Sequence, residues 1–225
     1  MDPYFFDEGY TLAAKTGHSI WGSSLAFLEY LVTERLSSKD GVIRDYLLKG
    51  LQTNQVLELG SGTGMTGIGM SRITSSQIIC TDIVALVPRI TKNIQLNGLL
   101  NVVAQPLDWT VDLDKQIKYQ VDPREATIIV GTDVTWLKEL SVAFIQTLAS
   151  LLTSTSVKPL LRLPLSTEIY RPKFGIWVYR ERGTSDSTIF ATYSSLLPVF
   201  TAHNLHVEPL CEYSGSRICI IYTLE

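Results

Sequence analysis

The chain has 225 residues, 45% of them hydrophobic, and a formal net charge of −3. This length suits one large α/β domain, and the apolar content excludes a disordered chain. The acidic balance, without a basic stripe, excludes the electrostatic footprint of a nucleic-acid-binding protein.

The first residues and the cysteines favour a cytoplasmic protein that binds no membrane and no metal. Residues 1–8 are acidic and lack the basic segment and long apolar core of a signal peptide. No apolar run reaches membrane-spanning length. Cys80, Cys211 and Cys219 are odd in number and far apart, so we expect buried thiols, and no ligand spacing indicates a metal site.

Helical patterns dominate the amino-terminal part of the chain. A helix is expected after residues 18–24, capped by Ser23 or Ser24. Its apolar positions recur at three- and four-residue spacing, at Leu25, Leu28, Val32 and Leu36. Residues 39–41 break this pattern, and a short second helix is expected at 42–48.

Strands and helices alternate along the rest of the chain. Strands are expected at 55–59, 77–82, 102–109, 127–133, 175–179, 205–207 and 217–222. Helices are expected at 66–73, from Pro88 to Asn97, along the face of Leu140 to Leu151, and at 187–197, where Pro198 ends or kinks the helix. Residues 158–172 predict an irregular stretch. The alternation predicts a mostly parallel sheet, with the last two strands as an antiparallel edge hairpin.

The stretch 56–67, VLELGSGTGMTG, predicts a buried strand, a glycine turn and the start of a helix. Its apolar residues suit a strand that is covered on both faces. Gly60, Gly62 and Gly64 let the backbone turn tightly and approach a ligand closely. The free N–H groups of the following helix point back at the turn, so the stretch predicts a nucleotide site at the carboxyl end of a parallel strand.

Two kinds of cofactor use such a turn. The spacing Gly62-x-Gly64-x-x-Gly67 matches the dinucleotide fingerprint, but the match is displaced, because Gly60 already ends the strand. The frame Glu58-x-Gly60-x-Gly62-x-Gly64 begins on the strand and resembles the S-adenosylmethionine turn of the seven-strand methyltransferases. A turn that binds nothing, with Glu58 paired to a neighbouring Arg or Lys, is the structural alternative.

Four successive strands end near an acid. These residues are Glu58, Asp82, Asp108 and Asp133. A parallel sheet brings all four to one edge, where ligands bind. We therefore expect the functional site at this edge.

Several further stretches resemble methyltransferase family 16, the methyltransferase-like 21 type of protein-lysine methyltransferases. They are Ile20-Trp21, VLELGSGTGMTGI, Thr81-Asp82-Ile83 with Asn93-x-x-x-Asn97, Leu107-Asp108-Trp109 and GTDVTW at 131–136. The resemblance implies a Rossmann-like seven-stranded α/β sheet, mostly parallel with an antiparallel C-terminal strand and helices on both faces. It also implies a single domain, 1–225, in which residues 1–50 form an N-terminal extension and helices covering the cofactor site and 51–225 form the core.

The resemblance further implies S-adenosyl-L-methionine as cofactor. The residues that would bind it are Trp21, Glu58, Gly60, Ser61, Gly62, Gly64, Asp82, Asp108, Trp109 and Thr132. Glu58 would face the amino end of the methionine moiety. Asp82 would hold the ribose hydroxyls, since a carboxylate accepts two hydrogen bonds. Asp108 and Trp109 would border the adenine, and Trp21 would cover the cofactor. The alternatives are a capping or surface role for Asp82 and core packing for the two tryptophans.

The residues after strand four carry the expected catalytic pair. In the family an acid is followed by two residues and then by Tyr or Phe, whereas this chain has Asp133-x-x-Trp136. An acid and an aromatic face suit an ammonium-bearing side chain. The alternative for Asp133 is the N-cap of the following helix. The motif is not the Asn/Asp-Pro-Pro-Tyr/Phe of enzymes that methylate exocyclic base amines.

Three functions remain open from the sequence. The resemblance favours methyl transfer to a lysine of a protein, with an elongation factor or a chaperone as the partner of a monomeric enzyme. A small-molecule methyltransferase would use the same cofactor half. A non-catalytic or dinucleotide-binding protein of similar fold is disfavoured by the position of Glu58.

Overall fold

The computed structural model describes residues 17–116, 119–154, 173–182, 184 and 187–223. The irregular stretch predicted at 158–172 lies outside these residues. Within them, no helix is both long enough and apolar enough to cross a membrane.

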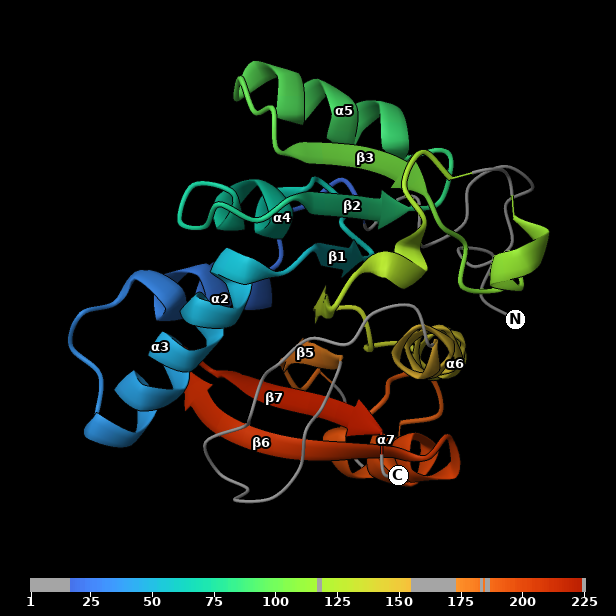
Figure 1. Ribbon diagram of the computed structural model, residues 1–225. Coiled ribbons are helices and arrows are strands. Elements are labelled where there is room, and N and C mark those ends of the chain that lie inside the picture. Colours follow the sequence, from blue (N-terminus) through green and yellow to red (C-terminus); the bar gives the residue numbers. More distant parts are fainter. Residues whose placement is uncertain (1–16, 117–118, 155–172, 183, 185–186, 224–225) are drawn as a thin grey trace.

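One seven-stranded sheet organises the molecule (Figure 1). Its strands are β1 (Val56–Leu59), β2 (Ile78–Asp82), β3 (Val102–Pro106), β4 (Ile128–Thr132), β5 (Phe174–Tyr179), β6 (Leu205–Tyr213) and β7 (Ser216–Thr223), in the spatial order β3-β2-β1-β4-β5-β7-β6. Strands β1 to β5 are parallel, and β7 is antiparallel to both β5 and β6. The predicted fold class and the edge hairpin are therefore confirmed.

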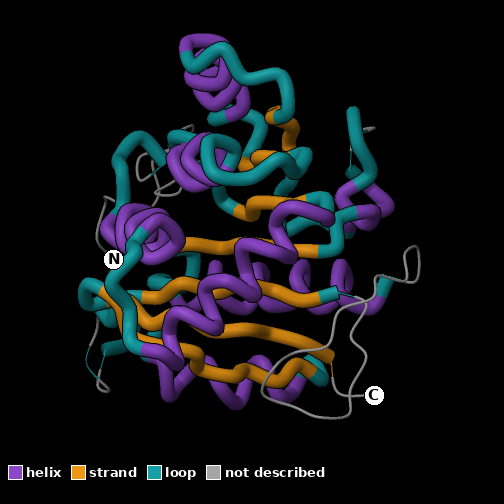
Figure 2. Tube along the Cα trace, turned by 60° about the vertical axis from the view of Figure 1, so that its left-hand side comes forward, coloured by secondary structure: helices purple, strands orange, loops and turns teal. Residues whose placement is uncertain are grey.

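Helices cover both faces of the sheet (Figures 1 and 2). Helices α2 (Gly22–Val32), α3 (Ser38–Thr53), α4 (Met65–Met70) and α5 (Val87–Leu96) contribute to one apolar cluster, and α6 (Lys138–Thr153) and α7 (Tyr193–Ala202) to the other. Two short 3₁₀ turns, η2 (Leu113–Lys115) and η3 (Pro123–Glu125), lie between β3 and β4. Helices on both faces require strands that are apolar on both sides, as the sequence of β1 and β4 shows.

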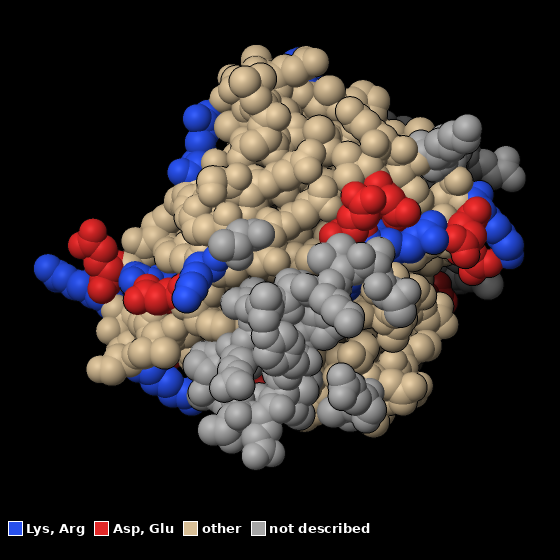
Figure 3. Space-filling model, viewed as in Figure 1, with Lys and Arg blue, Asp and Glu red and all other residues tan. Residues whose placement is uncertain are grey.

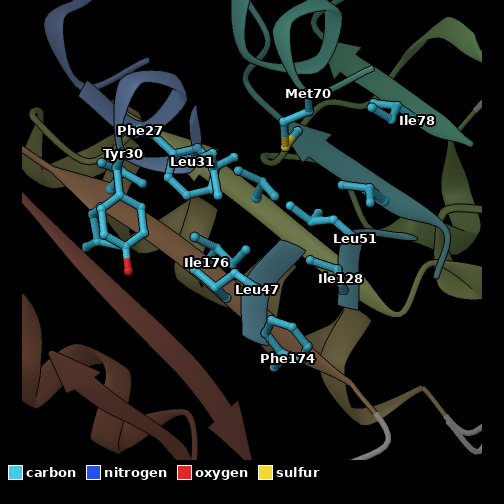
Figure 4. Packing of buried hydrophobic residues seen from close by; sticks show 14 of the residues in the cluster. Phe27, Tyr30, Leu31, Leu47, Leu51, Met70, Ile78, Ile128, Phe174 and Ile176 are labelled. Carbon is cyan, nitrogen blue, oxygen red and sulfur yellow. The ribbon is translucent and has the colours of Figure 1, made fainter. Parts of the chain in front are cut away.

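The first apolar cluster joins α2 and α3 to the strands beneath them (Figure 4). Phe27 and Leu31 of α2 meet Leu47 and Leu51 of α3 in this cluster, and Ile176 of β5 belongs to it as well. All five side chains are at most 2% exposed. This packing fixes the start of α2 near the carboxyl edge of the central strands.

The structure corrects the predicted face of α2. The sequence predicted Leu25 and Val32 on the buried side, but they are 42% and 56% exposed. The buried face instead carries Ser23, Ser24, Ala26, Phe27, Tyr30 and Leu31. Apolar residues occur all round this helix, so their spacing did not identify the buried face, and the serines face inward because they contact the site described below.

Two other helices differ from the prediction in length. Helix α3 begins at Ser38 and includes Gly41, because Ser37 caps its start by accepting a hydrogen bond from the Asp40 N–H. Helix α7 begins at Tyr193, where Thr192 and Ser195 form a capping box, and continues through Pro198. Residues 39–41 therefore do not break the helical segment, and Pro198 does not end its helix.

Candidate active site

A pocket opens at the carboxyl edge of the central strands, where β1 has β2 on one side and β4 on the other. Open α/β sheets bind ligands at such a switch point. Five segments line it: Gly17, Ser19, Trp21 and Ser24; Gly60, Ser61, Gly62, Thr63 and Met65; Asp82 and Ile83; Leu107, Asp108, Trp109 and Thr110; and Thr132, Asp133, Val134, Trp136 and Leu140. The pocket encloses about 850 Å³, including space open to solvent, which suits a nucleoside-sized ligand.

The glycine turn forms the floor of the pocket at β1. Gly60, Gly62 and Gly64 have φ values of 69°, 55° and 79°, a region that side chains rarely adopt. A Cβ on Gly60 would lie 2.8 Å from Val134 and 2.9 Å from Trp109. A Cβ on Gly62 would lie 3.3 Å from the Gly17 carbonyl, because residues 17–21 cross over the turn. The turn therefore has room for a ligand only because these positions lack side chains.

Two predicted cofactor-binding residues do not line the pocket. Glu58 is 1% exposed, and its carboxylate accepts a hydrogen bond from the Gly67 N–H at 3.1 Å beneath the turn. Burial raises the pKa of Glu58 to about 7. Gly64 is the N-cap of α4 and packs toward Ile90 and Ile68. Both residues hold the turn and the helix together, and their contact with a cofactor stays a prediction.

Asp82 ends β2 beside the glycine turn and lines the pocket. Its carboxylate accepts hydrogen bonds from the Gly62 N–H at 2.7 Å and from the Ile83 N–H at 2.8 Å. Burial raises the pKa of Asp82 above its ordinary value, and the two N–H bonds oppose that rise. The side chain is therefore held in the pocket wall and is not a loose surface acid.

Asp108 and Trp109 line the pocket just beyond β3. Asp108 accepts hydrogen bonds from the backbone N–H and the hydroxyl of Thr110. The Trp109 ring meets Phe144 of α6 edge to face, with ring centroids 5.4 Å apart. Trp109 thus packs against the core while it borders the pocket, so the core-packing alternative holds and its contact with an adenine stays a prediction.

Three hydroxyls connect α2, α4 and β4 behind the pocket. The Thr132 hydroxyl lies 2.9 Å from the hydroxyl of Ser24 and 2.9 Å from that of Thr66. All three residues are buried. This network joins the amino-terminal helix to the strand that carries the predicted catalytic residues.

Asp133 follows β4 and has a positive φ of 57°. Its Oδ2 accepts a hydrogen bond from the Ser23 N–H at 2.8 Å and lies 3.0 Å from Nη2 of Arg182. Its Oδ1 is buried and has no hydrogen-bond partner among the described residues. Asp133 is not the N-cap of α6, which is Leu137, so that predicted alternative is wrong. Asp133 instead binds the first turn of α2, 110 residues earlier in the chain.

The aromatic side of the site is a row of three rings. Trp21 and Trp136 are stacked, with centroids 6.0 Å apart, and Trp136 lies 6.1 Å from Phe190. The guanidinium carbon of Arg182 is 4.3 Å from the centroid of the Trp21 ring. Trp21 and Trp136 both line the pocket, as the sequence predicted, whereas Phe190 extends the row beyond its lining.

Arg182 is the main residue that the sequence analysis missed. It lies three residues past β5, which neighbours β4, so Asp133 and Arg182 leave adjacent strands at the same edge. A charged residue just beyond a strand end is the signal that identified the four acids, and it would also have found this arginine. Ser24, Met65 and Ile83 of the lining carry no such signal.

The chain is similar to curated protein-lysine methyltransferases. The chain is 24% identical over 184 residues to the protein-lysine N-methyltransferase EFM6 of Saccharomyces cerevisiae, covering 77% of this chain and 68% of that protein. It is 27% identical to the protein N-lysine methyltransferase METTL21A of Xenopus tropicalis (61% and 56% of the two chains) and 27% identical to EEF1A lysine methyltransferase 3 of the same frog (57% and 50%). The chain thus spans about half the length of the two frog relatives.

The fold is shared with solved methyltransferase structures. The O-methyltransferase NcsB1 with bound S-adenosylmethionine superposes with a TM-score of 0.56 at 14% identity, covering 82% of this chain and 52% of that one. The mitomycin 7-O-methyltransferase MmcR also gives 0.56, at 12% identity, covering 90% and 55%. These likenesses show the fold alone. The family model described as lysine methyltransferase matches residues 8–164, more than half of the sequence, and this chain therefore belongs to the lysine methyltransferase family.

Proposed function

We propose that this protein transfers a methyl group from S-adenosylmethionine to a lysine side chain of a protein substrate. The observation that carries the proposal is one pocket with two different ends. Asp82 lines it from the end of β2, on one side of the glycine turn that follows β1, and Asp133 and Trp136 line it from beyond β4, on the other side. A chain of the lysine methyltransferase family needs both a cofactor cradle and an acceptor site, and the lining of this pocket supports the proposal that it supplies both.

The residues of the first end fit S-adenosylmethionine. Gly60 and Gly62 let the turn lie close to Trp109 and Gly17 of the pocket lining, Asp82 offers carboxylate oxygens for hydroxyl groups, and Trp109 offers an aromatic wall for the base. When bound, the cofactor supplies a methyl group on a positively charged sulfur. The glycine turn orients the ligand, and residues 17–21 cover it and exclude water.

The acceptor end must present an amine that has lost its proton. A free lysine amine has a pKa of about 10.4, so it is protonated near neutral pH. Asp133 and Trp136 would orient the amine, and burial would favour its neutral form. The proton leaves to water, because the structure gives Asp133 partners that suit a positioning role better than that of the sole base.

The partner is a protein, and we propose a translation elongation factor first and a chaperone second. Support for the elongation factor comes from the relative described as an EEF1A lysine methyltransferase. On the face drawn in Figure 3, Lys and Arg are scattered among Asp and Glu and form no continuous basic stripe, which does not favour a nucleic-acid substrate. We further propose that the enzyme acts in the cytoplasm as a monomer and that its 225 residues form one domain.

Labelled methyl transfer tests the proposal. Lysate from cells that lack this protein is incubated with labelled S-adenosylmethionine and the purified enzyme, and the labelled band is identified and hydrolysed. We expect label on a lysine of one protein. Asp133→Asn should bind cofactor and transfer little methyl, and Trp136→Phe should retain much of the transfer, since it supplies the aromatic type usual in the family. Label confined to small molecules would favour the second candidate function, a small-molecule methyltransferase.

A further inference from the structure

The carboxylate expected to meet the substrate already holds a cation of its own chain. Asp133 is buried, with its side chain 1% exposed, and its Oδ2 lies 3.0 Å from Nη2 of Arg182. The Arg182 side chain is 24% exposed, and its guanidinium lies over the ring of Trp21. The acid that would attract a lysine ammonium is therefore engaged by Arg182, which also lies over Trp21, the ring that stacks on Trp136.

The pair changes the charge of the acceptor end. Because the guanidinium offsets the carboxylate, an incoming amine meets a site that is nearly neutral. The other titratable groups nearby have different partners. Asp82 accepts from the Gly62 N–H, Asp108 from Thr110, Glu181 from the Tyr193 N–H, and the Tyr179 hydroxyl donates to the Ala191 carbonyl. Among the described residues, none of these groups is hydrogen-bonded or ion-paired to Asp133 or Arg182, so Arg182 supplies the charge in direct contact with Asp133.

We propose that Arg182 is a positioning residue that makes the acceptor end select the neutral amine over the ammonium form. This inference rests on the proposed function, since it assigns the charge state of the lysine that the site accepts. A like charge near the amine disfavours its protonated form. The neutral form carries the lone pair that attacks the methyl group, so selecting it places the nucleophile ready to react. The amine can still donate an N–H to Oδ1 of Asp133, which has no hydrogen-bond partner among the described residues.

The geometry explains why this residue is an arginine. A planar guanidinium can lie over an aromatic ring and pair with a carboxylate at the same time, whereas an ammonium group is a compact point charge. Arg182 thereby links three segments that are far apart in sequence, namely Trp21, Asp133 and the exit of β5. It fixes the position of the acid and compensates its charge.

Binding of n-butylamine, which has the same chain and amine as a lysine side chain, tests the inference. The protein is saturated with S-adenosylhomocysteine, and butylamine is titrated by NMR at several values between pH 7 and pH 9. If only the neutral amine binds, the apparent affinity of the wild-type protein rises about tenfold per pH unit, because this range lies below the amine pKa of about 10.4. Arg182→Met should lose this slope and bind at least about tenfold more tightly than wild type at pH 7, because the uncompensated carboxylate holds the ammonium form.

Two variants serve as controls. Arg182→Lys keeps the positive charge and should keep the slope. Arg180→Met removes an arginine two residues away that bonds to Ser216 and to the Ser214 carbonyl, and it should also keep the slope. Affinity for S-adenosylhomocysteine shows that each variant is folded. If Arg182→Met fails this check, Arg182→Gln is used, since it removes the charge and retains a polar side chain.

Two results would overturn the inference. One is a wild-type affinity for butylamine that is independent of pH or absent. The other is an affinity in Arg182→Met that changes with the same slope as in wild type, which would mean that Arg182 only occupies space or competes with the amine. The outcome is separate from that of the methyl-transfer experiment, because butylamine binding requires no protein substrate and no reaction. A wild-type protein that labels lysine but shows no pH slope leaves the proposed function intact and removes this inference.

Discussion

The four acids at the strand ends occupy similar places in the sequence but have different surroundings. Asp82, Asp108 and Asp133 line one pocket, as expected for the carboxyl edge of a parallel sheet. Glu58 points into the protein toward α4, and Asp133 is paired with Arg182. The sequence predicted that these acids gather at one edge, because strand order alone determines that. It could not predict their partners, which come from segments up to 110 residues away.

The ribose role of Asp82 can be measured directly. Asp82→Ala should weaken binding of S-adenosylhomocysteine by about 1.5–3 kcal/mol, the range for hydrogen bonds to a charged group. Isothermal calorimetry gives the affinity, and Asp114→Ala, which removes an exposed acid, is the control. The saturated rate of methyl transfer should change much less than the affinity. An unchanged affinity would contradict the ribose role. The function of Asp82 would then be only to bind the backbone N–H groups of Gly62 and Ile83.

Glu58 should make stability depend on pH. Burial raises the pKa of Glu58 from 4.5 to about 7, so the folded chain keeps a proton that the unfolded chain releases. The contribution of Glu58 to the free energy of unfolding is therefore fully present below about pH 4.5 and is lost as the pH rises through about 7. The loss amounts to roughly 3 kcal/mol at most.

Urea denaturation of the cofactor-free protein at several pH values measures this effect. Glu58→Gln has no proton to lose at this position, so its unfolding free energy should lack the decrease that the wild-type protein shows between these values. The unfolding free energy of the wild-type protein minus that of Glu58→Gln should therefore fall as the pH rises. A difference that stays constant with pH would mean that Glu58 titrates normally in the folded protein.

At the scale of elements, the sequence predicted strands better than helix ends. All seven strands were expected, since short apolar runs between turn residues are clear signals. The prediction of the buried face of α2 was wrong because Ser23 and Ser24 face inward. Ser23 contacts Asp133 and Ser24 contacts Thr132, and polar contacts of this kind cannot be predicted from the spacing of apolar residues. Helix α7 starts six residues beyond the predicted start, because the capping box that begins it is formed by Thr192 and Ser195.

Two glycines in helices give a matched prediction. Gly67 of α4 lies against β1 and β2, and a Cβ there would meet the Cys80 sulfur and lie 2.8 Å from Oε2 of Glu58. Gly41 of α3 has no atom within 4 Å of the position of its Cβ. Gly67→Ala should therefore destabilise the protein by about 1–3 kcal/mol. Gly41→Ala should stabilise it by up to about 1 kcal/mol, the helix-propensity gain.

Thermal and urea unfolding of both variants checks this pair. If both substitutions change the free energy of unfolding by the same amount, the close packing of α4 on the sheet does not make Gly67 necessary for stability. A stabilising Gly67→Ala would show that α4 can move away from β1 without loss of packing.

At the scale of the whole molecule, the fold and the family were predicted from the sequence and are confirmed, and the cofactor stays a proposal. The glycine frame and the order of the motifs were sufficient, because they are local signals in fixed sequence order. The contact of Asp133 with α2 and with Arg182, which follows β5, is a long-range property. It depends on Ser23, Asp133 and Arg182 meeting in space, and no spacing in the sequence records that meeting.

The cofactor should stabilise the folded protein as a whole, since the pocket joins segments from residue 17 to residue 140. S-adenosylhomocysteine at a hundred times its Kd should raise the free energy of unfolding by about 2.7 kcal/mol. NAD at the same concentration should have no effect, because the glycine frame and Asp82 suit the methyl-donor cofactor. Urea denaturation with each ligand measures this, and stabilisation by NAD would contradict the assignment of the cofactor.

The position of α2 has a consequence for how the chain folds during its synthesis. The Ser23 hydroxyl lies 3.3 Å from the Ser216 hydroxyl of β7, 193 residues later, and the Ser23 N–H binds Asp133. The first helix leaves the ribosome long before either partner exists, and contacts between distant residues form slowly. The nascent chain must therefore carry α2 without its contacts to Asp133 and Ser216 until those residues emerge, so the glycine turn can form before the acceptor end is complete.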